Sequence, residues 1–310
     1  MAIRKATLDD TSAIGALFRA RIPRWQRIDD HGGVEDLPYE RLTIYERWLH
    51  GGAWMSIETA AIWLSHLLRG AGEPWVLEEE GAITGYVELF LDDEGEPFGA
   101  HLQIGELVAQ EPGHELRTDE LMRFVIERAS KLRRITTNCS PYDTVRAEFF
   151  RRYGFIVLER LQQITLSAQT GQGFYKAIPQ PHAGAAQIKG WGMPIGRQTS
   201  ARQQWEMLWP SHWDAVPQIM ARRIDRHHFT ASGQEALLAL QQHLFDPRSA
   251  EVFCWTPKAL SAQVLVAIRD WAHRQGYRSL TLTVNENTAR TLAPEAESVP
   301  IQQDVLLRQT

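Results

Sequence analysis

Hydrophobic and polar residues recur along the chain with distinct periods, which predict an ordered series of strands and helices. Residues 2–8 alternate as a strand does, and the acidic pair Asp9-Asp10 opens a helix predicted over residues 13–21. Between residues 37 and 69, large apolar residues return at roughly helical intervals and predict further helices. The chain therefore begins with a strand followed by helices.

From residue 74 the period shortens to that of strands. WVLEEE and ITGYVELFL flank Gly81 and predict a β-hairpin, and HLQIGELVA has the continuous apolar character of a central strand. Leu121, Phe124, Val125 and Ala129 mark an amphipathic helix. The strand RRITTNCS, a helix ending in RRYGF and the strand IVLERLQQITL follow. Together these elements predict one mixed α/β domain over residues 1–168.

A change of composition follows this domain. Residues 169–203 are rich in Gln, Gly, Pro and Ala, which is typical of a linker with irregular structure. Residues 204–310 then repeat the earlier order in shorter form. WEMLW, AEVFCW and SLTLTV are predicted strands, and SHWDAVPQIMARR, GQEALLALQQHLF and SAQVLVAIRDWAHRQG are predicted helices. Because residues 268–290 match residues 125–147 in the order of their elements, we interpret the chain as an internal duplication whose second copy is truncated.

Composition narrows the range of functions. A chain of 310 residues fits two domains, and 44% hydrophobic with 23% charged residues is ordinary for a globular protein. The sequence lacks the apolar run of about 18 residues that a membrane span needs. We expect no membrane insertion, and a cytoplasmic location because the first residues lack a signal-peptide pattern. A net charge of -5 argues against nucleic acid as a partner.

The metal-binding residue types show no recognisable spacing. Cys139 and Cys254 lie far apart and are interpreted as buried thiols, without a histidine placed to activate Cys139 as a nucleophile. His227 and His228 are adjacent and make a poor chelate, so we interpret them as a solvated helix end. The sequence therefore predicts no metal site.

Three segments resemble the GNAT family of acyl-coenzyme A dependent N-acyltransferases. They are IRKATLDDTSAIGALF, ELVAQEPGHELRTDELMRFVIERA and DTVRAEFFRRYGF. The resemblance implies a mixed, mostly antiparallel sheet flanked by helices, followed by a second, truncated GNAT-like domain, as in mycothiol synthase-like members. In this family the amides at a helix N-terminus hold the pyrophosphate of the coenzyme, because they are unpaired donors at the positive end of the helix dipole.

The resemblance also assigns roles to individual residues. It places Val108 beside the pantetheine arm, and it places the pyrophosphate loop on Gly113, His114, Arg117 and Thr118. The family loop is richer in glycine, and here Glu115 and Leu116 stand within it. Phe150 occupies the position of the usual tyrosine acid, whereas Gly154-Phe155 matches the family pattern. Tyr153 is interpreted as a packing residue.

Glu106, in the predicted central strand, is the candidate catalytic base. Family members often carry a carboxylate there, and the attacking amine must lose a proton. The alternative is a glutamate at a strand edge that faces solvent or pairs with an arginine.

Residues 92–96 either attract a cationic amine or form a solvated hairpin end. Trp48, Trp54 and Trp63 either line an acceptor pocket or belong to the core.

Two functions follow from the resemblance. The first is an N-acyltransferase that uses acetyl-CoA as cosubstrate and transfers acetyl to an amine of a small molecule or peptide. The alternative is a catalytically inactive GNAT-like protein that binds acyl-CoA or another ligand as a sensor. The expected partners are an acyl-CoA and an amine acceptor, and a homodimer is left open.

Overall fold

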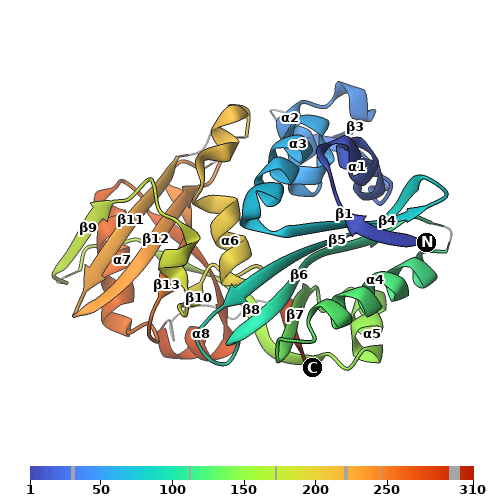
Figure 1. Cartoon of the computed structure of the whole chain (residues 1–310). Coiled ribbons are helices and arrows are strands. Elements are labelled where there is room, and N and C mark those ends of the chain that lie inside the picture. Colours follow the sequence, from blue (N-terminus) through green and yellow to red (C-terminus); the bar gives the residue numbers. More distant parts are fainter. Residues whose placement is uncertain (29–31, 112, 172, 220–222, 245, 293–300) are drawn as a thin grey trace. The chain divides into compact units, whose positions relative to one another are not determined.

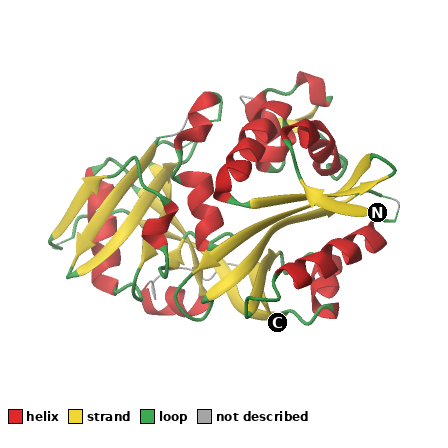
Figure 2. Ribbon diagram, in the orientation of Figure 1, coloured by secondary structure: helices red, strands yellow, loops and turns green. Residues whose placement is uncertain are grey.

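The computed structural model describes residues 1–28, 32–111, 113–171, 173–219, 223–244, 246–292 and 301–310 as a mixed α/β fold (Figures 1 and 2). The chain forms two compact units. The first comprises Met1–Phe90, Ile104–Arg128 and Ser211–Ala221, and the second comprises the remaining residues. These units do not follow the segments 1–168, 169–203 and 204–310, which remain a prediction about the two copies. Within the described residues, no helix is both long and apolar enough to cross a bilayer.

Strands and helices of the first unit follow the predicted order. Strands β1, β4, β5 and β6 are neighbours in that order, and helices α1 to α4 accompany them. The hairpin of β4 and β5 turns at Gly81, whose φ of +82° suits glycine. The bounds are β1 Ala2–Lys5, α1 Thr11–Arg19, β2 Gln26–Ile28, β3 Val34–Asp36, α2 Ile44–Trp48, α3 Ile57–His66, β4 Glu73–Glu79, β5 Ala82–Asp93, β6 Ala100–Ala109 and α4 His114–Arg128. Strands β5 and β6 continue into the second unit.

The second unit is built on a sheet with the strand order β7-β15-β8-β14-β13-β12-β11-β9. Most neighbouring pairs are antiparallel, whereas β13 and β14 are parallel. The bounds are β7 Arg134–Cys139, α5 Thr144–Arg152, β8 Ile156–Ser167, β9 Tyr175–Pro179, β10 Gly192–Ile195, α6 Ala201–Leu208, β11 Ile224–Ala231, β12 Gln234–Gln242, β13 Ser249–Thr256, α7 Ala262–Arg274, β14 Ser279–Asn285, α8 Glu286–Leu292 and β15 Ile301–Gln309. The predicted fold class is confirmed.

Strand β12 is buried on both faces, and the helix predicted for this segment is wrong. Leu238 and Leu240 belong to the same apolar cluster as α7, whereas Leu237 and Ala239 pack with α6. Successive side chains of a strand point to opposite faces, so a strand covered on both sides reads as one apolar run. That run cannot be distinguished from a buried helix by its period.

Other predicted elements of the second copy also differ. WEMLW forms the end of α6 and the residue after it, where Trp205, Leu208 and Trp209 share one helical face and the two tryptophan rings stack 4.2 Å apart. His227 and His228 lie in strand β11 and not at a helix end. The helix predicted over SHWDAVPQIMARR is a 3-10 turn at Ser211–Ala215, and its residues 220–222 lie outside the described chain.

The internal duplication is visible in the order of elements. Helix α4, strand β7 and helix α5 of the first copy correspond to α7, β14 and α8 of the second. In both copies a long helix precedes a strand, and a shorter helix follows it. The matched sequence segments therefore adopt matching structures.

The two copies exchange their last strands. Strand β15, from the second copy, lies between β7 and β8 and is antiparallel to both, with Val305 opposite Asn138 and Glu159. Strand β8, from the first copy, lies between β15 and β14. Each copy thus completes the sheet of the other.

Removal of β15 should therefore destabilise the sheet. A chain ending at residue 300 leaves β7 and β8 with unpaired edges, and we expect it to aggregate. Leu306 is 5% exposed, and the substitution Leu306→Ala should lower the unfolding free energy by about 2–4 kcal/mol. Urea denaturation measures this cost. The exposed Gln309, changed to Ala, should stay within about 0.5 kcal/mol of the wild type.

Candidate functional site

A buried carboxylate lies at the centre of the first unit. Glu88 of β5 is 1% exposed, and its Oε2 accepts hydrogen bonds of 3.0 Å from Trp63 Nε1 and from the Tyr86 hydroxyl. Trp63 comes from α3, whereas Tyr86 is on the same strand and on the same face, two residues away. The two donors hold the carboxyl group in a fixed position.

Burial dominates the ionisation of Glu88. It raises the pKa of this carboxyl to about 8, and the negative charge of Glu106 acts in the same direction. The hydrogen bonds from Trp63 and Tyr86 act in the opposite direction because they favour the ionised form. Glu88 is therefore largely protonated at neutral pH, although it lies close to a second carboxylate.

Glu106 is half-buried in strand β6, the neighbour of β5. Its charge also acts on Tyr86, whose pKa is raised by burial first and then by Glu88 and Glu106. The predicted base thus belongs to a pair of carboxyl groups in different environments. Such pairs separate into one proton donor and one proton acceptor. A catalytic role for Glu106 remains a prediction.

Aromatic rings surround this pair. The rings of Phe18 and Trp54 stack 5.4 Å apart, and the Trp54 ring meets that of Tyr86 edge-on at 5.0 Å. Trp63 lies 6.1 Å from Trp213 in a stacked arrangement. Trp54 and Trp63 are buried, as the core interpretation requires.

The residues predicted to bind pyrophosphate gather at the start of α4. Gly113, with a φ of +87°, precedes the helix, and His114 is its first residue. Arg117 donates to Glu79 Oε2 and to the Gln110 carbonyl, and the hydroxyl of Thr118 donates to the His114 carbonyl. Both side chains are thus bonded within the protein. The backbone amides of the first turn remain the groups best suited to an anion.

The other positions that the resemblance singles out differ in their exposure to solvent. Val108 is 3% exposed in β6. Leu116 is 69% exposed and Glu115 is also exposed on α4. Phe150 is buried in α5, and its ring packs 5.2 Å from that of Phe155. The position of the family tyrosine is therefore part of the core.

In the described part of the second copy, strand β10 fills the space beyond the paired part of β13 and β14. The pairing of these two parallel strands ends at Val252 and Leu282. Strand β10 lies there instead, with Ile195 opposite Cys254, and the amide of Gly196 donates to the carbonyl of Thr283. The chain's own backbone occupies the gap between the strands. This agrees with the absence of a predicted catalytic role for the second copy.

Both cysteines are buried and unbridged, as predicted. Burial raises the pKa of Cys254 to about 12 and also raises the pKa of Cys139. A thiol that keeps its proton is a poor nucleophile. Neither cysteine belongs to the candidate site.

Glu88 is not among the residues predicted from the sequence. The signal for it is present, because one acidic residue interrupts the apolar strand ITGYVELFL between Tyr86 and Phe90. A buried strand rarely carries an unpaired carboxylate. Its partner Trp63 lies 25 positions away, however, and no local period connects the two.

Comparison with solved structures identifies the fold. No protein-family model and no curated protein matches this chain. A GCN5-related N-acetyltransferase from Anabaena variabilis has a TM-score of 0.58 at 10% identity, covering 99% of this chain and 72% of its own. A GCN5-related N-acetyltransferase from Kribbella flavida has a TM-score of 0.55 at 12% identity, and the match covers 99% of this chain and 71% of that protein. A protein from Pyrococcus horikoshii has a TM-score of 0.54 at 12% identity, covering 100% and 89%.

The chain therefore has the fold of the GCN5-related N-acetyltransferases, abbreviated GNAT. Its two copies stand in tandem, as the repeated order of elements shows. At these identities the likeness concerns the fold alone.

Glu88 should make stability depend on pH. Its pKa rises from 4.5 to about 8 on folding, so the folded protein binds more protons than the unfolded chain within this window. The unfolding free energy of the wild type therefore falls as the pH rises from 4.5 to about 8. Glu88→Gln keeps an oxygen for Trp63 and Tyr86 without titrating, and its unfolding free energy, measured in urea, should fall less. The exposed variant Glu40→Gln should follow the wild type, and an equally steep fall in Glu88→Gln would contradict the assignment.

Gly196 should be intolerant of a side chain. Its φ is +84°, and a Cβ atom would lie 2.6 Å from both Val252 O and Phe253 Cδ1. Gly196→Ala should lower the unfolding free energy by at least about 2 kcal/mol, because strain and overpacking add. Gly192→Ala is the matched control in the same strand segment, since its Cβ would meet nothing within 4 Å. Equal stability of the two variants would show that β10 does not fill the gap.

Proposed function

We propose that this protein is an N-acyltransferase that transfers the acetyl group of acetyl-CoA to an amine of a small molecule or peptide. The observation that carries the proposal is the pair of carboxyl groups, Glu88 and Glu106, on adjacent strands of a GNAT fold. Burial and mutual repulsion separate their affinities for protons. A structural glutamate pair has no need of this separation.

Acetyl-CoA supplies an acetyl group already activated as a thioester. The first turn of α4 suits its pyrophosphate, because this helix of 15 residues begins with backbone amides that point out of its end, and Gly113 lets the backbone approach closely. Val108, Gly113, His114, Arg117 and Thr118 are the proposed contacts. Arg117 would have to exchange its bonds to Glu79 and Gln110 for a bond to phosphate.

Glu106 acts as the base in this proposal. An ammonium group is not nucleophilic, so the acceptor must lose a proton before or during attack. Glu106 is half-buried on the strand next to Glu88, and burial favours the protonated, uncharged form of Glu88. Glu88 is too buried to touch an acceptor and acts as a positioning residue that tunes Glu106. Water, or a group other than the family tyrosine, returns a proton to the departing thiolate.

A second candidate function is ligand binding without turnover. Arg117 is engaged by Glu79, and Phe150 stands in the position of the usual acid. The position of Phe150 favours a protein that binds a ligand without turnover, and the engagement of Arg117 favours a ligand other than acyl-CoA. The second candidate is therefore a sensor that binds acyl-CoA or another ligand.

Titration with acetyl-CoA, followed by thiol release over a panel of amines, distinguishes the two functions. For a transferase, Glu106→Gln should lower kcat/KM by roughly 10²–10⁴-fold while acetyl-CoA binding stays unchanged. Glu40→Gln, an exposed control, should retain full activity. Binding without thiol release would support the sensor. A failure to bind acetyl-CoA would contradict the transferase and the acyl-CoA sensor alike, and would leave only a sensor for another ligand.

A further inference from the structure

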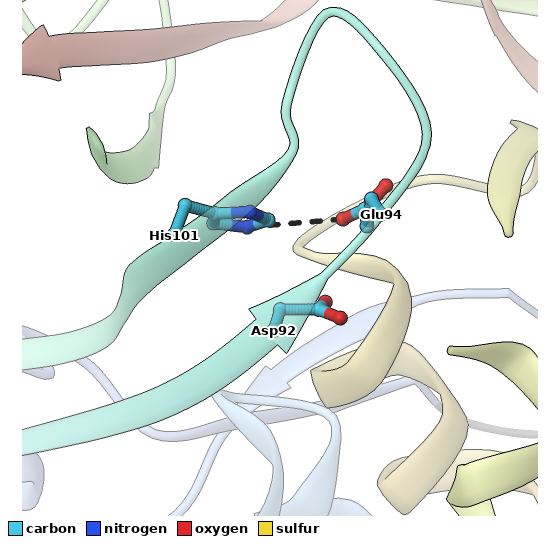
Figure 3. Close-up of side chains that lie close together, drawn as sticks. All are labelled: Asp92, Glu94 and His101. Atoms are coloured by element: carbon cyan, nitrogen blue, oxygen red, sulfur yellow. Dashed lines mark ion pairs between the residues drawn. The ribbon is translucent and has the colours of Figure 1, made fainter. Parts of the chain in front are cut away.

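Three potential metal ligands converge inside the second unit. Asp92 lies at the end of β5, and Glu94 comes directly after this strand. His101 lies near the start of β6, across the connecting turn (Figure 3). One ligand atom from each residue lies within 4.8 Å of the others. Glu94 is 3% exposed and His101 is 0% exposed, so the interpretation as a solvated hairpin end is wrong for Glu94, whereas Glu96 of the same segment is exposed.

His101 presents an unpartnered nitrogen to the two carboxylates. Its Nδ1 lies 2.8 Å from the carbonyl of Gly99, to which it donates, so Nε2 carries the lone pair of the neutral ring. Nε2 is buried without a hydrogen-bond partner and lies 3.8 Å from Glu94 Oε1, with the ring directed at the carboxylates (Figure 3). A ring fixed through Nδ1 by a carbonyl is the usual arrangement of a metal-bound histidine.

Both carboxylates are oriented by hydrogen bonds that leave acceptor sites open. Asp92 accepts from the amides of Asp93 and Arg202. Glu94 accepts from both terminal nitrogens of Arg197 and from the amide of Ala201. A carboxylate has about four lone-pair sites, so about two remain on Asp92 and about one on Glu94.

The charges of the cluster do not balance. Asp92, Glu94 and the adjacent Glu159 carry three negative charges when ionised, and Arg197 supplies one positive charge, which leaves two negative charges in a buried place. A divalent cation would neutralise the cluster.

We propose that Asp92, Glu94 and His101 form a site for a first-row divalent cation such as Zn²⁺. Two ligand atoms each about 2.1 Å from zinc are at most about 4.2 Å apart, so the 3.8 Å between Nε2 and Oε1 fits, provided that Oε1 exchanges its 3.2 Å hydrogen bond from Arg197 for the cation. The ligand atoms lie within 4.8 Å of one another, so binding of zinc would require them to approach by about half an ångström at most. One nitrogen and two oxygen ligands suit zinc better than Mg²⁺, which prefers oxygen ligands and retains its water.

A cavity lies next to the cluster in the same unit. Gly95, Phe98, Glu159 and Arg197, which adjoin the cluster, line a cavity of about 450 Å³. Arg197 is 4% exposed there, and its guanidinium lies 4.1 Å from the centre of the Phe98 ring. A bound cation would join the β5–β6 turn to the start of α6, so its role is structural and independent of acyl transfer.

Zn²⁺ titration of the full chain, after treatment with a chelator, tests the proposal. We expect one Zn²⁺ per chain, a rise in Tm on binding, and no displacement by excess Mg²⁺. His101→Gln and Asp92→Asn should each weaken Zn²⁺ binding by at least about tenfold and abolish the rise in Tm. His182→Gln, an exposed histidine elsewhere in the unit, should bind as the wild type does.

Circular dichroism of the metal-free variants checks that each one folds. If His101→Gln does not fold, Asp92→Asn alone provides the test. Undiminished Zn²⁺ binding by the folded variants would overturn the proposal, because the metal would then lie elsewhere. Absence of Zn²⁺ binding by the wild type would also overturn it.

Discussion

The sheet of the second unit depends on the exchange of β8 and β15 between the two copies. Each strand has neighbours from both sides of the duplication, so the hydrogen bonds that complete one copy are made by the other. A strand inside a sheet, unlike one at its edge, has no alternative partners. The duplication therefore produced one interdependent structure, in which the second copy was retained although β10 fills its slot.

Strand β5 and the turn after it carry two buried carboxyl groups whose surroundings give them opposite behaviour. Glu88 lies among aromatic rings beside another carboxylate, and burial raises its pKa to about 8. Glu94 is similarly buried, and burial is the largest influence raising its pKa, but the charge and hydrogen bonds of Arg197 together with the amide of Ala201 lower it overall. Burial acts in the same direction on both glutamates. The neighbouring groups, Glu106 in one case and Arg197 in the other, therefore account for the difference in their pKa values.

Most of the first copy could be predicted from sequence because its elements have clear periods and turn residues. The fold class, the hairpin at Gly81 and the duplication are all confirmed. The failures have a common physical cause. The segment of β12 has the pattern of a helix because it is covered on both faces, and Glu88 and the Asp92–His101 cluster depend on partners that only tertiary folding brings near. Local patterns do not encode such contacts.

The position of β15 has a consequence for how the chain is made. The ribosome makes residues 301–310 long after β7 and β8, yet these residues lie between the two strands. Until β15 emerges, β7 and β8 each have an open edge, the kind of surface to which chaperones bind and from which aggregates grow. Pairing between segments so far apart in the chain is also slow. The growing chain is therefore most prone to aggregation in the interval before β15 is made.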